Sequence, residues 1–184
     1  MNLRLRPLRL ENEAEFLAAH QSMEETDRFP FGLGYEPGMP WATYVDRLTA
    51  WRVGSDLPGD YVPNSLLVAD VNGVIVGRAS IRYEITNEFL AREGGHIGYC
   101  VLPDHRRNGY ATEILRQALV IARSVGVDRV LITCADDNAE SAAVIEHNGG
   151  VFESLTVTRD GGAGHVATGS TDYACVSVAR KCGL

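Results

Sequence analysis

The sequence GYCVLPDHRRNGYAT, residues 98–112, decides the fold of this chain. An apolar run ends at Pro103, a basic turn containing Gly109 follows, and apolar residues at helical spacing start directly afterwards. The first turn of a helix has unpaired backbone N–H groups and the positive end of the helix dipole. Because Arg106 and Arg107 lie beside those donors, the stretch predicts a strand, a phosphate-binding turn and a helix in succession.

Apolar periodicity predicts the elements on either side of this stretch. Asn72-Gly73 stands between two apolar runs, which is typical of a β-hairpin because both turn residues take positive φ. The same patterns predict strands over residues 3–8, 66–71, 74–83, 96–102 and 129–134, and helices over residues 11–25, 41–51, 111–122 and 138–147, the last ended by Asn148-Gly149-Gly150. We expect a final strand pair over 151–157 and 173–178, joined by a glycine-rich loop over 160–169.

The predicted order of elements is β-α-α-β-β-β-α-β-α-β-β. A hairpin combined with a βαβ crossover indicates an α/β protein of the α+β kind, with a mixed, twisted central β-sheet and helices on both faces. The 184 residues show no repeat and no linker, so we expect a single domain over residues 1–184.

Composition and charge exclude several classes of protein. The net charge of -7 argues against nucleic-acid binding and is compatible with a cationic partner such as an amine, a peptide or a polyamine. The N-terminus alternates basic and apolar residues and lacks a signal-peptide core, and no run has transmembrane length, so a cytoplasmic protein without membrane contact is expected. The four cysteines form no CxxC pair, so we expect no metal site and reduced thiols.

Three motifs together resemble a known family. Residues 106–111 read RRNGYA and match the pattern [Arg/Gln]-x-x-Gly-x-[Gly/Ala], in which the glycine allows a tight turn and the small last residue lets phosphate oxygens approach the backbone. Residues 94–99 read GGHIGY, and residues 138–152 read NAESAAVIEHNGGVF. Over about residues 65–155 the chain resembles the GNAT acetyltransferase superfamily, and within it a bacterial branch of predicted acetyltransferases.

The resemblance implies a cofactor and a set of site residues. The family binds acetyl-CoA and transfers the acetyl group to an amine. Its strand before the loop pairs with pantetheine through backbone groups, which corresponds here to Cys100 and Val101. By the same resemblance, Asn138 and Ser141 line the pantetheine, and the pyrophosphate is held by Arg106, Arg107, Asn108, Gly109, Tyr110, Ala111 and Thr112.

The sequence departs from the family's pattern at a residue used for proton transfer. Many members carry a tyrosine acid at the position of Ile145, and we consider Tyr110, Tyr99 or water as replacements. A thiol with a pKa of about 8.5 leaves as thiolate near pH 7 at a cost of only about 2 kcal/mol. The candidate bases for the attacking amine are Glu84 and His96, with Glu88 as a third, although local hydrogen bonding by His96 and a solvated Glu84 are the structural alternatives.

A loop before the second helix is a candidate wall for the acceptor. Residues 29–35 are rich in aromatic side chains and follow Glu24, Glu25 and Asp27, a combination that suits a cation. The alternative is a solvated helix end followed by a loop packed on the core.

These observations favour an acetyl-CoA-dependent N-acetyltransferase that transfers the acetyl group directly to a primary amine of a small molecule or peptide. The backbone near Val101 would polarise the thioester carbonyl, without a covalent intermediate on Cys100. The main alternative is a CoA- or acyl-CoA-binding module without turnover. A nucleotide-binding oxidoreductase and a purely structural protein are further alternatives, and a homodimer through the C-terminal strands is a family-level expectation.

Overall fold

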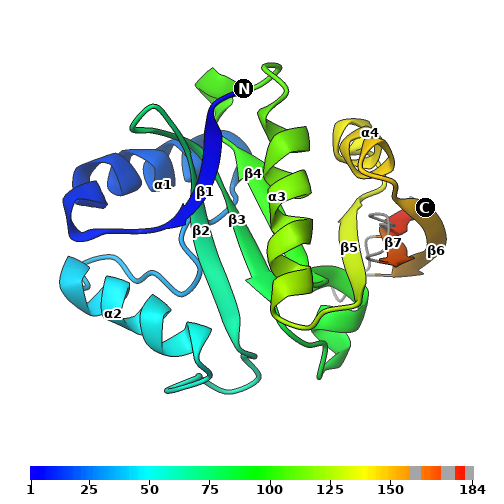
Figure 1. The fold of residues 1–184 in the computed structure, drawn as a ribbon, viewed down its shortest axis with the longest axis horizontal. Helices are drawn as coiled ribbons and strands as arrows, with labels where there is room; N and C mark the ends of the chain where they lie inside the picture. The colour runs from blue at the N-terminus through cyan, green and yellow to red at the C-terminus, as the bar shows by residue number, and fades with distance from the viewer. Residues whose placement is uncertain (158–162, 171–176, 181–184) are drawn as a thin grey trace. The chain divides into compact units, whose positions relative to one another are not determined.

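The computed structural model describes residues 1–157, 163–170 and 177–180 (Figure 1). The chain divides into two compact units. The first unit consists of Met1–Ser80 and Tyr99–Ile114, and the second unit consists of Ile81–Gly98 and Leu115–Leu184. The division falls within the elements β3, β4 and α3, whose bounds are given below, and each unit is described in turn.

The first unit is built on a four-stranded sheet with the strand order β1-β2-β3-β4. Its strands are β1 (Leu3–Pro7), β2 (Asn64–Val71), β3 (Val74–Arg82) and β4 (Ile97–Val101). The predicted hairpin is confirmed: Asn72 has φ 54 and Gly73 has φ 89, as a two-residue turn between right-twisted strands requires. The Asp70 carboxylate accepts a hydrogen bond of 2.8 Å from the Gly73 N–H and holds the turn closed.

Two helices, α1 (Glu13–Asp27) and α2 (Trp41–Arg52), cover this sheet with an aromatic core. α1 begins later than predicted because residues Leu10–Asn12 form a 3-10 turn, η1. Tyr44 and Leu48 of α2 are buried in this core, and Val45 packs against it partly buried. The core also includes Phe16, Ala19, Met23, Phe31, Trp41, Trp51, Leu66, Val68 and Ile75.

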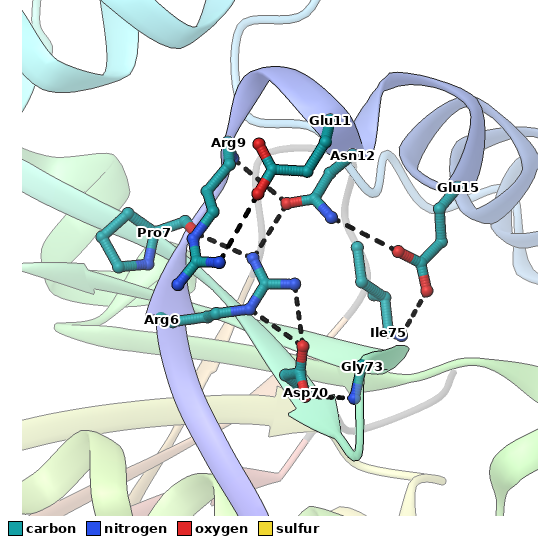
Figure 2. A network of polar contacts seen from close by, with 9 residues as sticks. All are labelled: Arg6, Pro7, Arg9, Glu11, Asn12, Glu15, Asp70, Gly73 and Ile75. Atoms are coloured by element: carbon teal, nitrogen blue, oxygen red, sulfur yellow. Dashed lines mark hydrogen bonds and ion pairs between the residues drawn. The ribbon is translucent and has the colours of Figure 1, made fainter.

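A polar network joins the end of β1 to the start of α1 and to the β2–β3 hairpin (Figure 2). The Arg6 guanidinium pairs with the Asp70 carboxylate at 2.8 Å and donates to the Asn12 side-chain oxygen at 2.8 Å. The same oxygen accepts from the Arg9 N–H at 3.1 Å, and the Glu15 carboxylate accepts from the Ile75 N–H. Burial opposes ionisation of Asp70, but the Gly73 N–H and Arg6 outweigh it and lower the pKa of this carboxyl.

Removing the shared acceptor of this network should destabilise the protein. In Asn12→Ala the Arg9 N–H and the Arg6 guanidinium both lose an acceptor near the buried position of residue 12, so we expect the free energy of unfolding to fall by roughly 1–3 kcal/mol. Urea denaturation measures this loss. Asn2→Ala removes an exposed side-chain hydrogen bond to Asn72 and is the matched control, expected to change stability by less than about 0.5 kcal/mol.

The second unit contains a second sheet, with the order β5-β7-β6 and with β8 paired to β7. Its elements include η2, a π-helical turn (Leu90–Gly94), β5 (Arg129–Ala135), α4 (Ala139–His147), β6 (Val151–Val157), β7 (Ala163–Ser170) and β8 (Ser177–Arg180). The helix α3 (Tyr110–Ser124) buries Leu115, Ala118 and Ala122. α4 ends as predicted, because the Gly150 N–H donates to the Ile145 carbonyl at 3.0 Å.

One prediction about the second unit is wrong. The glycine-rich stretch expected to be a loop over 160–169 forms β7 from Ala163 onward, which adds a strand to the predicted order. β7 lies between β5 and β6 and pairs with both in antiparallel register. Two neighbouring strands satisfy its backbone hydrogen bonds, which offsets the low strand preference of glycine. The expected strand over 173–178 falls mostly on residues 171–176, which lie outside the described residues.

Candidate active site

The first feature of the candidate site is the outer edge of β4. The Leu102 N–H donates to the Val76 carbonyl of β3 at 2.9 Å. Because successive residues of an antiparallel strand direct their backbone groups to opposite sides, the N–H and C=O of Val101 point away from β3. β4 ends its sheet, and no strand of the described ranges extends that sheet beyond it. The Val101 N–H therefore lies on the side of β4 away from β3, and on that side the Val101 carbonyl accepts a hydrogen bond of 3.3 Å from the Nε of Arg106.

The second feature is the turn from β4 into α3. A 3-10 turn, η3 (Pro103–His105), follows β4, and Arg107 and Gly109 then adopt positive φ, 63 and 75. The Asn108 amide closes the turn by donating to the carbonyls of His105 and Arg106, both at 3.1 Å. Residues 106–109 are exposed, and the helix starts at Tyr110. The predicted succession of strand, basic turn and helix is confirmed.

The two arginines of the turn differ in their surroundings. The Arg106 guanidinium forms an ion pair with Asp27, the last residue of α1, and its Nε donates to the Val101 carbonyl at 3.3 Å. Arg107, in contrast, is exposed at the position with φ 63. Arg106 is thus held by two protein groups, and both arginines are exposed beside the N-terminus of α3. The partnership with Asp27 was not predicted from the sequence.

Among the candidate residues of the second unit, His96 makes local bonds. Its backbone N–H donates to the Leu131 carbonyl at 2.7 Å, and its Nδ1 accepts from the Leu131 N–H at 2.9 Å. Nδ1 therefore carries no proton, and the neutral ring has its proton on Nε2. Burial, reinforced by the positive charge of Arg82, lowers the pKa of His96 to about 4. The predicted local bonding is confirmed, and a catalytic role for His96 stays a prediction.

The depressed pKa of His96 predicts a pH-dependent stability. An unfolded histidine protonates below about pH 6.5, whereas the native His96 resists protonation until about pH 4, so the unfolded state binds more protons between these values. Stability should fall as pH is lowered through this window. Urea denaturation at pH 7 and pH 4.5 measures the loss in the free energy of unfolding. The loss should be smaller for His96→Gln than for the wild-type chain. Equal losses in the two proteins would contradict the assignment.

The remaining candidate site residues of the second unit lie at the start of α4 and in the segment that follows β3. Asn138 caps α4, its side-chain oxygen accepting the Ser141 N–H at 2.9 Å. Glu84 is exposed two residues beyond β3, and Glu88 pairs with Arg92 at 2.9 Å. Contacts of Asn138 and Ser141 with a cofactor, and a role of Glu84 as a base, stay predictions.

Comparison with known proteins identifies the family. The model of the family described as "Acetyltransferase (GNAT) domain" matches residues 2–151. The chain belongs to the GNAT acetyltransferase family. A curated relative, aminoglycoside N(6')-acetyltransferase type 1 from Acinetobacter haemolyticus, is 35% identical over 85 residues, which are 46% of this chain and 59% of the relative. The chain therefore spans less than two thirds of that relative.

Solved structures share the fold of this GNAT chain. Mycobacterium smegmatis RimJ in complex with CoA-disulfide has a TM-score of 0.67 and 20% identity, with 92% of this chain and 82% of that chain covered. Spermidine N-acetyltransferase from Vibrio cholerae, in complex with CoA and spermine, has a TM-score of 0.64 and 15% identity, with 94% and 97% covered. The predicted α+β GNAT fold is confirmed. None of the helices in the described ranges combines the length and apolar character needed to cross a membrane.

Two positions of this GNAT chain bear on proton transfer. Ile145 is fully buried in α4, so the position that by resemblance corresponds to the family's tyrosine acid holds a core side chain. Tyr110 opens α3 and is partly buried, and its role as an acid stays a prediction. Cys100 is a free thiol whose pKa is raised by burial, so it is protonated near neutral pH and poorly suited to attack a thioester.

The aromatic loop of this GNAT chain, residues 29–35, packs on the core. This is the alternative to a wall of the acceptor site. Phe31 is fully buried, and the Tyr44 hydroxyl donates to the Leu33 carbonyl at 3.1 Å. Phe29 remains 37% exposed, with the buried Arg78 guanidinium 4.9 Å from its ring centroid. Arg78 also donates to the Pro30 carbonyl at 3.1 Å. Sequence reasoning missed Arg78, since a single arginine within an apolar strand carries no signal of its partners.

Proposed function

We propose that this chain is an acetyl-CoA-dependent N-acetyltransferase that transfers the acetyl group directly to the primary amine of a small molecule or peptide. The observation that supports it most is the exposed basic turn that contains Arg107, between the Val101 end of β4 and the start of α3. Backbone donors, a helix dipole and an arginine meet there, as a diphosphate requires. The family membership supports acetyl-CoA as the source of that diphosphate.

The proposed cofactor site follows from the first unit. The Val101 backbone pairs with the pantetheine, and the turn of residues 106–112 binds the diphosphate; the Cys100 backbone, predicted to share this contact, points toward β3 by the same alternation. Arg107 supplies the exposed charge, while Arg106 contributes through its bond to the Val101 carbonyl. Asn138 and Ser141 are proposed to contact the pantetheine from the start of α4. When bound, acetyl-CoA supplies the activated acetyl group.

In the proposed reaction the Val101 N–H donates to the thioester oxygen as charge develops on it. The amine attacks in its neutral form, and deprotonation of a lysine-like amine at pH 7 costs about 4.6 kcal/mol, against about 1 kcal/mol for an α-amine. Glu84 is the proposed base, because its carboxylate is exposed, whereas the Nδ1 of His96 is occupied by the Leu131 N–H. The departing thiolate takes its proton from Tyr110 or from water.

The acceptor is proposed to be a cationic amine. The net charge of -7 favours the approach of a cation. Two similar proteins are by name an aminoglycoside and a spermidine acetyltransferase, and both of those acceptors carry several amines. A cytoplasmic location and a homodimer through the C-terminal strands stay predictions; residues 158–162, 171–176 and 181–184 of that region lie outside the described residues.

A two-stage experiment tests the proposal against its alternatives. Thermal-shift titrations with acetyl-CoA, CoA and NAD come first, and we expect the two CoA compounds to stabilise the protein and NAD not to do so. Thiol release from acetyl-CoA is then measured across a broad panel of amines. Binding of CoA without thiol release from any amine would favour a CoA-binding module. Stabilisation by NAD alone would favour an oxidoreductase, and no response to any of the three would overturn the proposal.

A further inference from the structure

The ion pair of Asp27 with Arg106 lies on the side of β4 that faces away from β3. Asp27 is the last residue of α1, and its Oδ2 atom pairs with the Nη2 of Arg106. The Nε of the same guanidinium donates to the Val101 carbonyl at 3.3 Å. Because the N–H and the carbonyl of an extended residue point to the same side of its strand, the Val101 N–H points to this side too. A carboxylate therefore lies on the side of β4 where the thioester is proposed to bind.

The charges that act on Cys100 place the ion pair in the same region. Burial raises the pKa of the Cys100 thiol, and the charges of Arg78, Asp27 and Arg106 also act on it. A charge shifts a pKa appreciably only from nearby. Since Cys100 directly precedes Val101, the carboxylate of Asp27 lies near two consecutive residues at the end of β4.

Arg106 uses only part of the carboxylate of Asp27. The Oδ2 atom accepts from the guanidinium, whereas the Oδ1 atom has no hydrogen-bond partner among the residues that the structure describes. The Asp27 side chain is 30% exposed. A carboxylate has about four lone-pair sites on its two oxygens, and an ammonium group is a donor without an acceptor. Asp27 can therefore keep Arg106 and accept a hydrogen bond from a cationic ligand as well.

The chemistry of the proposed acceptor supplies such a cation. The amine that attacks the thioester must be neutral, so it does not pair with a carboxylate as an ammonium. Any further alkyl amine of the same acceptor keeps its proton at pH 7, because its pKa lies well above that value. An acceptor with two amines therefore brings one neutral nucleophile and one ammonium into the site.

We propose that Asp27 binds the second, protonated amine of the acceptor while the first amine attacks the thioester. The inference rests on the proposed function and deepens it, because it names molecules with two or more amines as the acceptor class. Asp27 is the residue that selects them, and Arg106 neutralises the carboxylate when no acceptor is bound. Loss of the carboxylate should therefore weaken the binding of diamines and leave monoamines almost unaffected.

Calorimetric titration of the CoA-bound protein measures acceptor binding without turnover. The ligands are straight-chain diamines of increasing length and the monoamines of the same lengths. For each length, the Kd of the monoamine is divided by the Kd of the diamine, so that effects on CoA or on the fold cancel. The variants Asp27→Asn and Arg106→Gln break the same ion pair from its two ends. Glu24→Gln removes the same charge from an exposed position of α1 and is the matched control.

We expect the wild-type chain to bind at least one diamine about tenfold more tightly than the monoamine of equal length. Asp27→Asn should lower this ratio roughly five- to tenfold, as a charge-assisted hydrogen bond at a partly exposed carboxylate implies. Arg106→Gln should keep or raise the ratio, because the carboxylate remains and a competing positive charge is gone. Glu24→Gln should change the ratio by less than about twofold.

The two ends of the ion pair separate a binding role from a structural one. An equal fall of the ratio in Asp27→Asn and Arg106→Gln would mean that the intact pair matters only for the fold, and would overturn the inference. An equal fall in Glu24→Gln would overturn it in favour of a general effect of negative charge. An unchanged ratio in Asp27→Asn would also overturn it.

The wild-type chain provides a test that depends on no variant. Binding of CoA without a preference for any diamine would overturn the inference and leave the proposed function intact. Failure of the wild-type chain to bind CoA would instead overturn the proposed function, so the two failures are distinguishable.

Discussion

Gly77→Ala is expected to be the most damaging single substitution on the strand that supports the candidate site. A Cβ at this position of β3 would lie 2.3 Å from the Cys100 carbonyl oxygen and 3.1 Å from the Val101 Cα. Both atoms belong to the backbone of β4, so no side-chain rotation relieves the overlap. Overpacking of a core typically costs about 1–3 kcal/mol. Here a strand must also move, and we expect a loss of at least about 3 kcal/mol in the free energy of unfolding.

Function should fail together with stability in this variant. Displacement of β4 moves the Val101 backbone, which is the proposed partner of pantetheine, so CoA should no longer raise the Tm. Urea denaturation and a CoA titration measure the two effects. Gly73→Ala is the comparison: a Cβ there meets no atom within 4 Å but retains φ 89, so strain alone should cost about 1–2 kcal/mol. Normal stability and CoA binding in Gly77→Ala would contradict the close approach of β3 and β4.

Arg107→Ala is expected to have the largest effect on cofactor affinity. Arg107 is an exposed arginine of the turn, and a charge-assisted hydrogen bond to a phosphate is worth about 1.5–3 kcal/mol. The Kd for CoA should therefore rise roughly 10- to 150-fold. Stability should change little, since the side chain is exposed and alanine, like arginine, has a Cβ at the positive φ of 63.

Calorimetric titration with CoA at two salt concentrations measures this effect. The loss of affinity should be smaller at high salt, because ionic strength screens the contact of an exposed arginine with a phosphate. Arg4→Ala removes the same charge from the exposed β1 position and is the control, expected to leave the Kd within about twofold. An unchanged Kd in Arg107→Ala would argue against the basic turn as the diphosphate site.

Local patterns account for the features of the fold that were predicted correctly. The Asn72-Gly73 turn depends on the backbone preferences of two adjacent residues, and the start of α3 depends on apolar spacing within a few turns. Motifs of this kind are complete within a short stretch of chain. For the same reason residues 98–112 were sufficient to predict the strand, the basic turn and the helix, whereas the family was predicted from residues 94–99, 106–111 and 138–152 together.

Contacts between distant segments account for the side-chain partners and the strand that the sequence did not predict. Asp27 and Arg106 are 79 positions apart, the Nδ1 of His96 meets an amide 35 positions away, and Arg78 reaches a carbonyl 48 positions away. Each residue type alone is compatible with several roles, so its partner decides whether it binds a ligand or holds the fold. β7 is a similar case, because pairing with β5 and β6 made a strand of a glycine-rich stretch.

Residues 98–112 alone determine the order of elements around the turn, since glycine torsions and helix periodicity act over a few residues; they also suggest the proposed anion site at the start of α3, because the N–H groups there belong to the same stretch. The ion pair of Arg106 with Asp27 depends on the position of the end of α1 beside that turn, which residues 98–112 do not determine. Ion pairs and buried hydrogen bonds form only where folding brings distant groups together, and that proximity is a property of the tertiary structure.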